Sequence, residues 1–168
     1  TLDDPRESRF IKGGYGEIYE LKDSAMITEK PYAVKILKND SIYFSAERIL
    51  AYQKPDSLNT KKSFLRAFHK ARMFKSNAQA RADSLSFNET ELHLIRKPIL
   101  WTGERQVTGD IIKAYFNTKN ENLDSLKVIG NALAISKVDS ISLKDEFNQV
   151  KGKYMTVYFK ENEIRLAK

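Results

Sequence analysis

The 168-residue sequence contains no cysteine. A disulfide framework and a cysteine-ligated metal site are therefore excluded. No apolar run approaches the roughly 20 residues that a membrane-spanning helix needs, so the sequence predicts no transmembrane segment. The two histidines, His69 and His93, stand apart without carboxylates at metal-ligand spacing. We therefore expect no metal centre and no cofactor.

Catalytic motifs are also missing, although residues 11–38 imitate the N-terminal lobe of a protein kinase. IKGGYGEIYEL resembles a glycine-rich loop, and YAVKILK resembles the strand that carries the phosphate-binding lysine. Ile11 occupies the place of the first glycine, and no HRD catalytic loop or DFG metal site follows. We reject a kinase and interpret GGYG as a turn that permits positive φ.

The net charge of +7 arises from 29 basic and 22 acidic residues scattered along the chain. A solvated surface and attraction to an anionic partner are both consistent with this charge. No arginine-rich tract or nucleic-acid-binding motif is present, and Tyr115 and Phe116 fall where the core of a strand needs them. We predict no nucleic-acid partner.

Two short patterns alternate along the chain and predict repeated strand pairs. The first places a small residue and then a polar one inside an apolar strand, as in FSAERILA (44–51), ARADSLSF (80–87), VTGDIIKA (107–114) and VKGKYMTV (150–157). The second is a short apolar run after a small or cyclic residue, as in KPYAV, KARMF, KPILW and GNALAI. In the first pattern the period of two shifts by one at the small residue, which predicts a bend or β-bulge there.

Polar breaks separate these strands, so we predict an all-β, antiparallel protein with a single domain over 1–168 and a possible loop or sub-boundary near 53–63. Residues 63–85 also place apolar side chains on one helical face, and their alanines and arginines favour a helix. We prefer strands there because KARMF and ARADSLSF match the other repeats.

The acidic residues Glu47, Asp83 and Asp110 occupy one repeat position, which raises the question of paired catalytic carboxylates. Lys153 fills that position in the fourth copy. A position that accepts either sign of charge is typical of an exposed bend residue. We therefore predict no catalytic residue and no enzymatic activity, while an enzyme with scattered catalytic residues on a β-sandwich stays an alternative.

The order of several weak motifs resembles OstA-like proteins of the lipopolysaccharide-transport (Lpt) family of Gram-negative bacteria. These motifs are ADSLSF, KPILW followed by QVTGDIIKAYF, GNALAIS and FNQVKGKYM. The resemblance extends back to GYGEIYELKDSAMITEKPYAV and so covers most of the chain. One departure is Gly152-Lys153, where the other copies carry a small residue followed by an acid.

The resemblance implies an open, twisted β-jellyroll whose apolar groove shields the acyl chains of lipid A. It implies a non-enzymatic carrier in the periplasm, with lipopolysaccharide as ligand and with other Lpt-type jellyrolls or copies of itself as partners through strand-edge pairing. The chain starts at Thr1 without a signal peptide and stops inside EIRLAK. We therefore expect the natural protein to continue, with Glu163 to Lys168 as a candidate joining edge.

We predict that one face of each strand lines the groove, with small residues leaving space or permitting the bend. The predicted groove residues are Phe44, Ala46, Ile49, Ala82, Leu85, Phe87, Leu100, Trp101, Gly109, Ile112, Ala114, Phe116, Met155, Val157 and Phe159. Lys97, Arg105 or Lys113 at its mouth are candidates for contact with lipid phosphates. The alternative is a structural or adhesive β-repeat module with a filled core, no groove and protein partners.

Overall fold

The computed structural model describes residues 1–4, 8–117, 119, 121–137, 147–160 and 163–167. Within these residues the chain is built from antiparallel strands, and a 3₁₀ helix, η2 (Glu20–Lys22), lies between two of them. No helix in the described ranges has the length and apolar character needed to cross a membrane. The prediction of an all-β fold is confirmed, and residues 63–85 are strand, as preferred over a helix.

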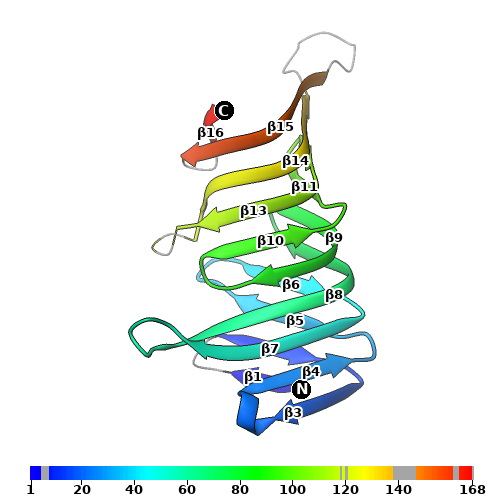
Figure 1. Cartoon of the computed structure of the whole chain (residues 1–168), viewed down its shortest axis with the longest axis vertical. Coiled ribbons are helices and arrows are strands. Elements are labelled where there is room, and N and C mark those ends of the chain that lie inside the picture. Colours follow the sequence, from blue (N-terminus) through cyan, green and yellow to red (C-terminus); the bar gives the residue numbers. More distant parts are fainter. Residues whose placement is uncertain (5–7, 118, 120, 138–146, 161–162, 168) are drawn as a thin grey trace.

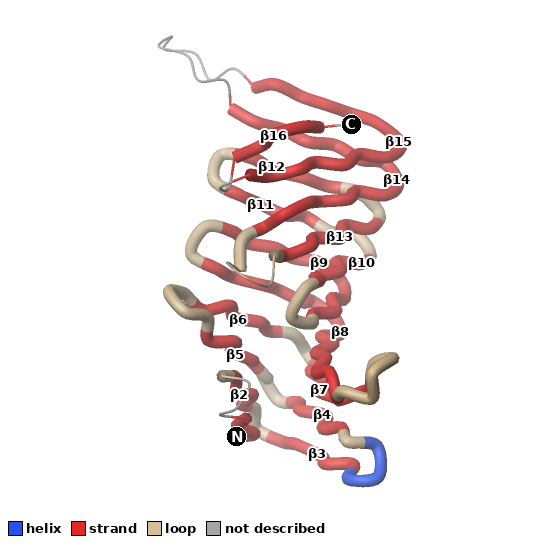
Figure 2. Tube along the Cα trace, turned by 90° about the vertical axis from the view of Figure 1, so that its left-hand side faces the viewer, coloured by secondary structure: helices blue, strands red, loops and turns tan. Residues whose placement is uncertain are grey.

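The strands form one sheet that folds along a corner into two walls (Figures 1 and 2). Four long strands bend at the corner and contribute to both walls: β8 (Lys61–Lys75), β9 (Ala78–Phe87), β14 (Leu123–Lys137) and β15 (Phe147–Lys160). The first wall also contains β2 (Arg9–Lys12), β5 (Tyr32–Ile36), β6 (Ser41–Ser45), β11 (Ile99–Thr102) and β12 (Arg105–Thr108). The second wall also contains β3 (Tyr15–Tyr19), β4 (Ser24–Thr28), β7 (Arg48–Pro55), β10 (Glu91–Ile95), β13 (Ile111–Phe116) and β16 (Glu163–Ala167). Strand β1 (Leu2–Asp4) pairs with β2.

The corner runs across the strands from one end of the sheet to the other, and the two sequence patterns alternate along it. The first pattern contributes its small residue and the residue after it, such as Ala46-Glu47 or Gly109-Asp110. The second contributes two consecutive residues with positive φ, and these pairs are Glu29-Lys30, His69-Lys70, Arg96-Lys97 and Gly130-Asn131. In β8 and β14 the pairing register shifts at these residues. The predicted bends are therefore present, but the left-handed backbone lies on the neighbouring pattern, mostly at residues other than glycine.

Hydrogen bonds and ion pairs join neighbouring layers of the corner. The Glu47 amide donates to the His69 carbonyl at 3.0 Å, and Lys70 Nζ lies 2.7 Å from Glu47 Oε1. The hydrogen bond from Lys70 lowers the pKa of the Glu47 carboxyl. Asp83 lies 3.5 Å from His69 Nδ1 and 3.4 Å from Arg96 Nε. These acids pair with neighbouring corner residues on the outside of the molecule, consistent with their interpretation as bend residues.

The GGYG segment differs from the turn predicted for it. Neither Gly13, Gly14 nor Gly16 has a positive φ. Instead, Gly13 gives space, since a Cβ there would lie 2.6 Å from the carbonyl oxygen of Thr28. The glycine is required by close approach of the next strand, and the positive-φ interpretation was wrong.

Residues 53–63, singled out as a possible loop or sub-boundary, form the end of the β7–β8 hairpin, which projects from the body in Figure 1. Asp56 Oδ1 accepts hydrogen bonds from the amides of Leu58 and Thr60, both at 2.9 Å. The two strands pair continuously from Arg48 opposite Phe68 to Pro55 opposite Lys61. The strands on either side of this turn therefore belong to the same sheet.

Candidate functional site

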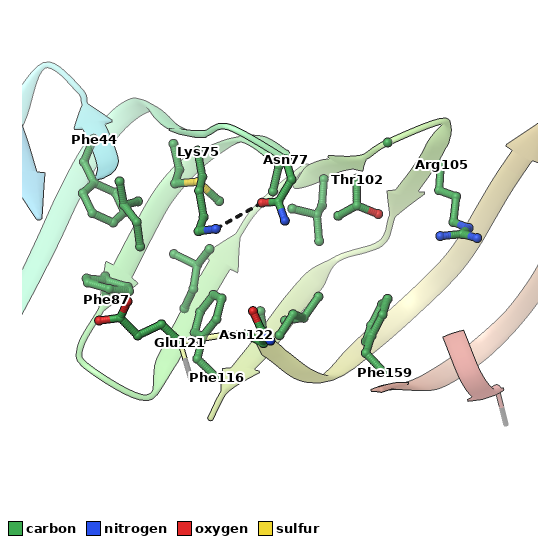
Figure 3. A pocket seen from close by; sticks show the side chains of 18 residues that line it. Phe44, Lys75, Asn77, Phe87, Thr102, Arg105, Phe116, Glu121, Asn122 and Phe159 are labelled. Carbon is green, nitrogen blue, oxygen red and sulfur yellow. Dashed lines mark hydrogen bonds between the residues drawn. The ribbon is translucent and has the colours of Figure 1, made fainter. Parts of the chain in front are cut away.

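A cavity of about 240 Å³ lies between the two walls, on the side away from the corner. Figure 3 shows its side chains converging from both walls. Apolar side chains from the first wall that line it are Ile42, Phe44, Met73, Ala78 and Leu100. Apolar side chains from the second wall are Phe87, Leu92, Ala114, Phe116, Leu123 and Phe159.

Strand pairing explains why these residues meet. In the first wall Phe44 lies opposite Met73, Met73 opposite Ala80, and Ala80 opposite Leu100. Because side chains alternate between the two faces of a strand, cross-strand partners share a face. One row of inward side chains therefore crosses the wall.

The second wall has a matching row in which Phe87 lies opposite Leu92, Leu92 opposite Ala114, and Ala114 opposite Leu126. Ala114 places a single methyl group among larger side chains, as Ala80 does in the first wall. Where such a small side chain borders the interior, as Ala114 does at the cavity, volume stays unfilled.

Aromatic rings bridge the walls at one end of the cavity. Phe44 comes from β6 in the first wall and Phe87 from β9 in the second, and their ring centroids lie 4.9 Å apart with an interplanar angle of 40°. Phe116 contacts Phe87 edge to face at 6.5 Å. The three rings are visible together on the left of Figure 3. This geometry is favourable for aromatic pairs and holds the walls at a fixed separation there.

The rim of the cavity is polar. Lys75 Nζ lies 3.1 Å from Asp40 Oδ2 and 3.3 Å from Asn77 Oδ1. Asp40 also accepts a hydrogen bond from Ser76 Oγ at 2.6 Å, so it ties the β5–β6 turn to the β8–β9 turn. Hydrogen bonds from Ser76, the Ser41 amide and Lys75 lower the pKa of Asp40 to about 2. Asp40 is therefore ionised and holds this lip of the first wall in place at neutral pH.

A hydrogen bond connects the rims of the two walls. Glu121 Oε2, on the second wall, accepts a hydrogen bond from the amide of Lys38 on the first, at 3.3 Å. Arg105 and Asn122 also line the cavity, Arg105 at the end opposite Phe44 and Phe87 (Figure 3). The arrangement is an apolar interior with charged groups at its edge. It suits an amphiphile better than a small polar substrate.

All the predicted groove residues except Trp101 fall into three sets by their distance from the corner. Those that line the cavity are Phe44, Phe87, Leu100, Ala114, Phe116 and Phe159. Those that are buried nearer the corner, or beside the cavity, are Ile49, Leu85, Ile112, Met155 and Val157. Those at the corner itself are Ala46, Ala82 and Gly109, where a Cβ added to Gly109 would lie 2.5 Å from Val128 Cγ1.

Trp101 is placed on the outer face, opposite to its neighbour Leu100. Its indole Nε1 donates to Gln106 Oε1 at 3.0 Å, and the Arg81 guanidinium lies 5.7 Å from its ring. Ile42, Met73 and Leu92 line the cavity but were absent from the predicted set. Alternation along the strands accounts for all three. Each lies two positions from another inward residue of its own strand or directly opposite an inward residue of the neighbouring strand.

The three basic candidates are separated. Arg105 lines the cavity, while Lys97 lies in the corner and Lys113 is opposite His93 and Lys127 on the outer face of the second wall. Across the ranges that the structure describes, no group of three or more histidine or acidic side chains is placed to hold a metal ion. The acids of the corner lie outside the cavity, so they do not converge on anything bound there.

The fold matches that of a known transport protein. LptH of Pseudomonas aeruginosa, described as the LptA-homologous periplasmic component of the conserved lipopolysaccharide transport device, superposes with a TM-score of 0.57. The match covers 86% of this chain and 95% of LptH, at 9% sequence identity. No protein-family model matches the sequence. No curated protein sequence matches it either. The chain therefore has the LptA-like fold, as the sequence resemblance predicted.

Proposed function

We propose that the protein is a non-enzymatic periplasmic carrier that shelters the acyl chains of lipopolysaccharide, through its lipid A part, in the cavity between the walls. The observation that carries the proposal is the cavity of about 240 Å³, bounded by Phe44, Leu100, Phe116 and Phe159 in an LptA-like fold. Each methylene removed from water contributes about 0.8 kcal/mol, so even part of one acyl chain supplies useful affinity.

The polar rim supports the same ligand class. Arg105 lies at the end of the cavity near Phe159, where the head group of an inserted amphiphile would meet solvent. A guanidinium can bind a phosphate oxygen through two parallel hydrogen bonds. Lys97 and Lys113 lie too far round the molecule to share this role. We propose Arg105 as the phosphate contact.

Binding of purified lipid A, measured by displacement of a fluorescent fatty acid, tests the proposal. Phe159→Glu places a carboxylate on the lining and should weaken binding by about tenfold or more, because desolvating an unpaired polar group costs ~1–3 kcal/mol. Phe74→Glu is the matched control, since Phe74 is 49% exposed and lies on the outer face opposite Tyr43. Circular dichroism of both variants serves as the control for folding.

Two results would contradict the proposal. If folded wild-type protein binds no lipid A, a structural or adhesive β-repeat module that binds protein partners explains the fold better than a lipid carrier does. If Phe74→Glu weakens binding as much as Phe159→Glu, the effect comes from surface charge and the cavity is not the site. Arg105→Gln should lower affinity for lipid A more than affinity for its dephosphorylated form.

We further propose that the protein joins other Lpt-type jellyrolls, or copies of itself, through strand edges. Among the described residues, β3 pairs only with β4 at one end, and β16 pairs only with β15 at the other. Such edges present unpaired backbone groups that recruit a further strand. Ile18 on β3 is 68% exposed and Tyr154 on β15 is 63% exposed, so apolar surface accompanies both edges.

Deleting residues 161–168, of which 161, 162 and 168 lie outside the described residues, tests this edge. The deletion should abolish concentration-dependent self-association in sedimentation velocity while leaving lipid binding in place. Unchanged self-association would show that the joining edge lies elsewhere. Substituting proline for Glu17 in β3 is the corresponding test at the other end, because proline removes a backbone donor from the edge.

A further inference from the structure

We infer that Phe44 and Phe87 form a partition that closes the cavity at one end and limits the length of acyl chain it accepts. This inference rests on the proposed function. The two rings come from opposite walls and meet in the middle, with centroids 4.9 Å apart. Phe44 is 2% exposed, and Phe87 is further held by Phe116. No other aromatic pair among the described side chains joins the two walls across the interior in this way.

A second cavity lies directly behind the rings. Its volume is about 40 Å³, and Phe44 and Phe87 line it as well as the main cavity. Apolar side chains on its other sides are Phe10, Ile11, Ala33, Val34, Ala51, Phe64 and Leu65. The same two rings therefore lie between two apolar spaces.

The backbone does not close the space between the cavities. The inward row of the first wall continues from Phe44 to Ala33 on β5 and to Ile11 on β2, in unbroken register. The walls thus run past the partition with their inward face unchanged. Phe44 and Phe87 are the side chains that both cavities share, so a substitution there can change the barrier without altering a strand.

A hydrogen-bonded polar pair lines one part of the second cavity. Arg9 Nη2 donates to Ser63 Oγ at 2.6 Å, and Ser63 is 6% exposed. An acyl chain that passed the partition would meet this hydrogen-bonded pair, which an apolar tail cannot satisfy. A third cavity, of about 490 Å³, shares Arg9, Phe10, Ile11 and Ala51 with the second. Opening the partition should therefore lengthen the accessible space at least by the second cavity.

The consequence is a limit on chain length. In the wild type, each methylene up to the rings should raise affinity about fourfold, after which longer chains gain nothing or bind less well. Phe87→Ala should move this limit to longer chains. A chain that is one methylene longer than the wild-type limit should then bind Phe87→Ala at least about fourfold more tightly than it binds the wild type. Chains shorter than the limit should bind the two proteins with similar affinity.

The test is a titration of the full chain with saturated fatty acids from decanoate to stearate, below their micelle concentrations. Phe74→Ala is the control, because it removes a phenylalanine ring from the outer face. Phe87→Leu serves if Phe87→Ala fails to fold, since leucine keeps apolar contacts but shortens the barrier. Thermal unfolding monitored by circular dichroism establishes folding for each variant.

The outcomes separate the two proposals. A limit that shifts to longer chains in Phe87→Ala or Phe87→Leu, but not in Phe74→Ala, supports the partition. Binding with an identical limit in all variants overturns the partition while leaving the carrier function in place. Failure of the folded wild type to bind any chain overturns the carrier function, and the partition with it.

Discussion

Gly109 is a corner position where the structure leaves no room for a side chain, so alanine there tests how the walls meet. A methyl group at this position would lie 2.5 Å from Val128 Cγ1 and 3.1 Å from the carbonyl oxygen of Gly130. Val128 is 1% exposed and has no room to turn away. Overpacking of this kind costs ~1–3 kcal/mol, which exceeds the ~0.4–1 kcal/mol gained by restricting the unfolded chain. We expect Gly109→Ala to lower the free energy of unfolding by about 1–2 kcal/mol.

A double-mutant cycle with Val128→Ala isolates the cause. Val128→Ala alone should cost about 2 kcal/mol, from lost burial and the cavity left behind. In the double variant, the methyl group added at position 109 occupies the space vacated by Cγ1, so the two costs should not add. We expect a favourable coupling of ~1 kcal/mol in urea unfolding, incomplete because the Gly130 contact remains. Costs that add to within ~0.5 kcal/mol would refute the steric explanation.

Three further predictions concern the rim, the core and the outer face. The pKa of Asp40 falls from 3.8 in the unfolded chain to about 2 in the folded protein. The ionised carboxylate therefore contributes its full stabilisation of the fold above pH 3.8, and this contribution is lost as the pH falls through about 2. The urea midpoints of wild type and Asp40→Asn should therefore differ at neutral pH and converge near pH 2; a constant difference would argue against the carboxylate. Ile112→Ala, at a fully buried site, should cost ~2–5 kcal/mol in urea unfolding, whereas Ile36→Ala, at a half-exposed site, should cost less than ~0.5 kcal/mol. Trp101→Ala should leave lipid A affinity unchanged in the displacement assay, and a tenfold loss would place the ring in the site.

The strands were predictable because the period of two is local. Ile112, Ala114 and Phe116 alternate in the sequence and face inward together in the structure. The polar breaks at Asn39-Asp40 and Asn88 likewise coincide with turns, and in the latter the Asn88 side chain accepts hydrogen bonds from the Thr90 and Glu91 amides. Patterns that depend on one strand can be read from that strand alone.

Features that depend on how neighbouring strands approach were harder to predict. The positive-φ pairs of the corner include Glu29-Lys30 and Arg96-Lys97, residue types with no strong preference for that conformation. Trp101 was assigned to the groove as an apolar residue, yet alternation from Leu100 puts it outside. Gly13 was interpreted through its own backbone freedom, whereas its reason is the adjacent Thr28 carbonyl.

The position of the cavity, in contrast, follows a rule within the first repeat pattern. Three residues after each small residue stand Ile49, Leu85, Ile112 and Met155, which are buried next to the corner and do not line the cavity. In three of the four copies, residues five or seven positions after the small residue line it, namely Phe87, Ala114, Phe116 and Phe159, while Val157 of the last copy is buried beside it. The small residues let the walls meet closely at the corner, and the branched or flexible side chains three positions on fill the narrow space beyond.

Farther from the corner, the side chains leave part of the space between the walls unfilled, and that space is the cavity. One repeat therefore encodes both a sealed corner and an unfilled outer space. The distinction between core and groove, which composition alone left open, corresponds to the distance of a residue from the bend. On this reasoning, enlarging Ala114 should reduce lipid binding with little loss of stability, because its side chain borders unfilled volume, whereas enlarging Ala132 beside the corner should destabilise the fold, because that position is fully buried.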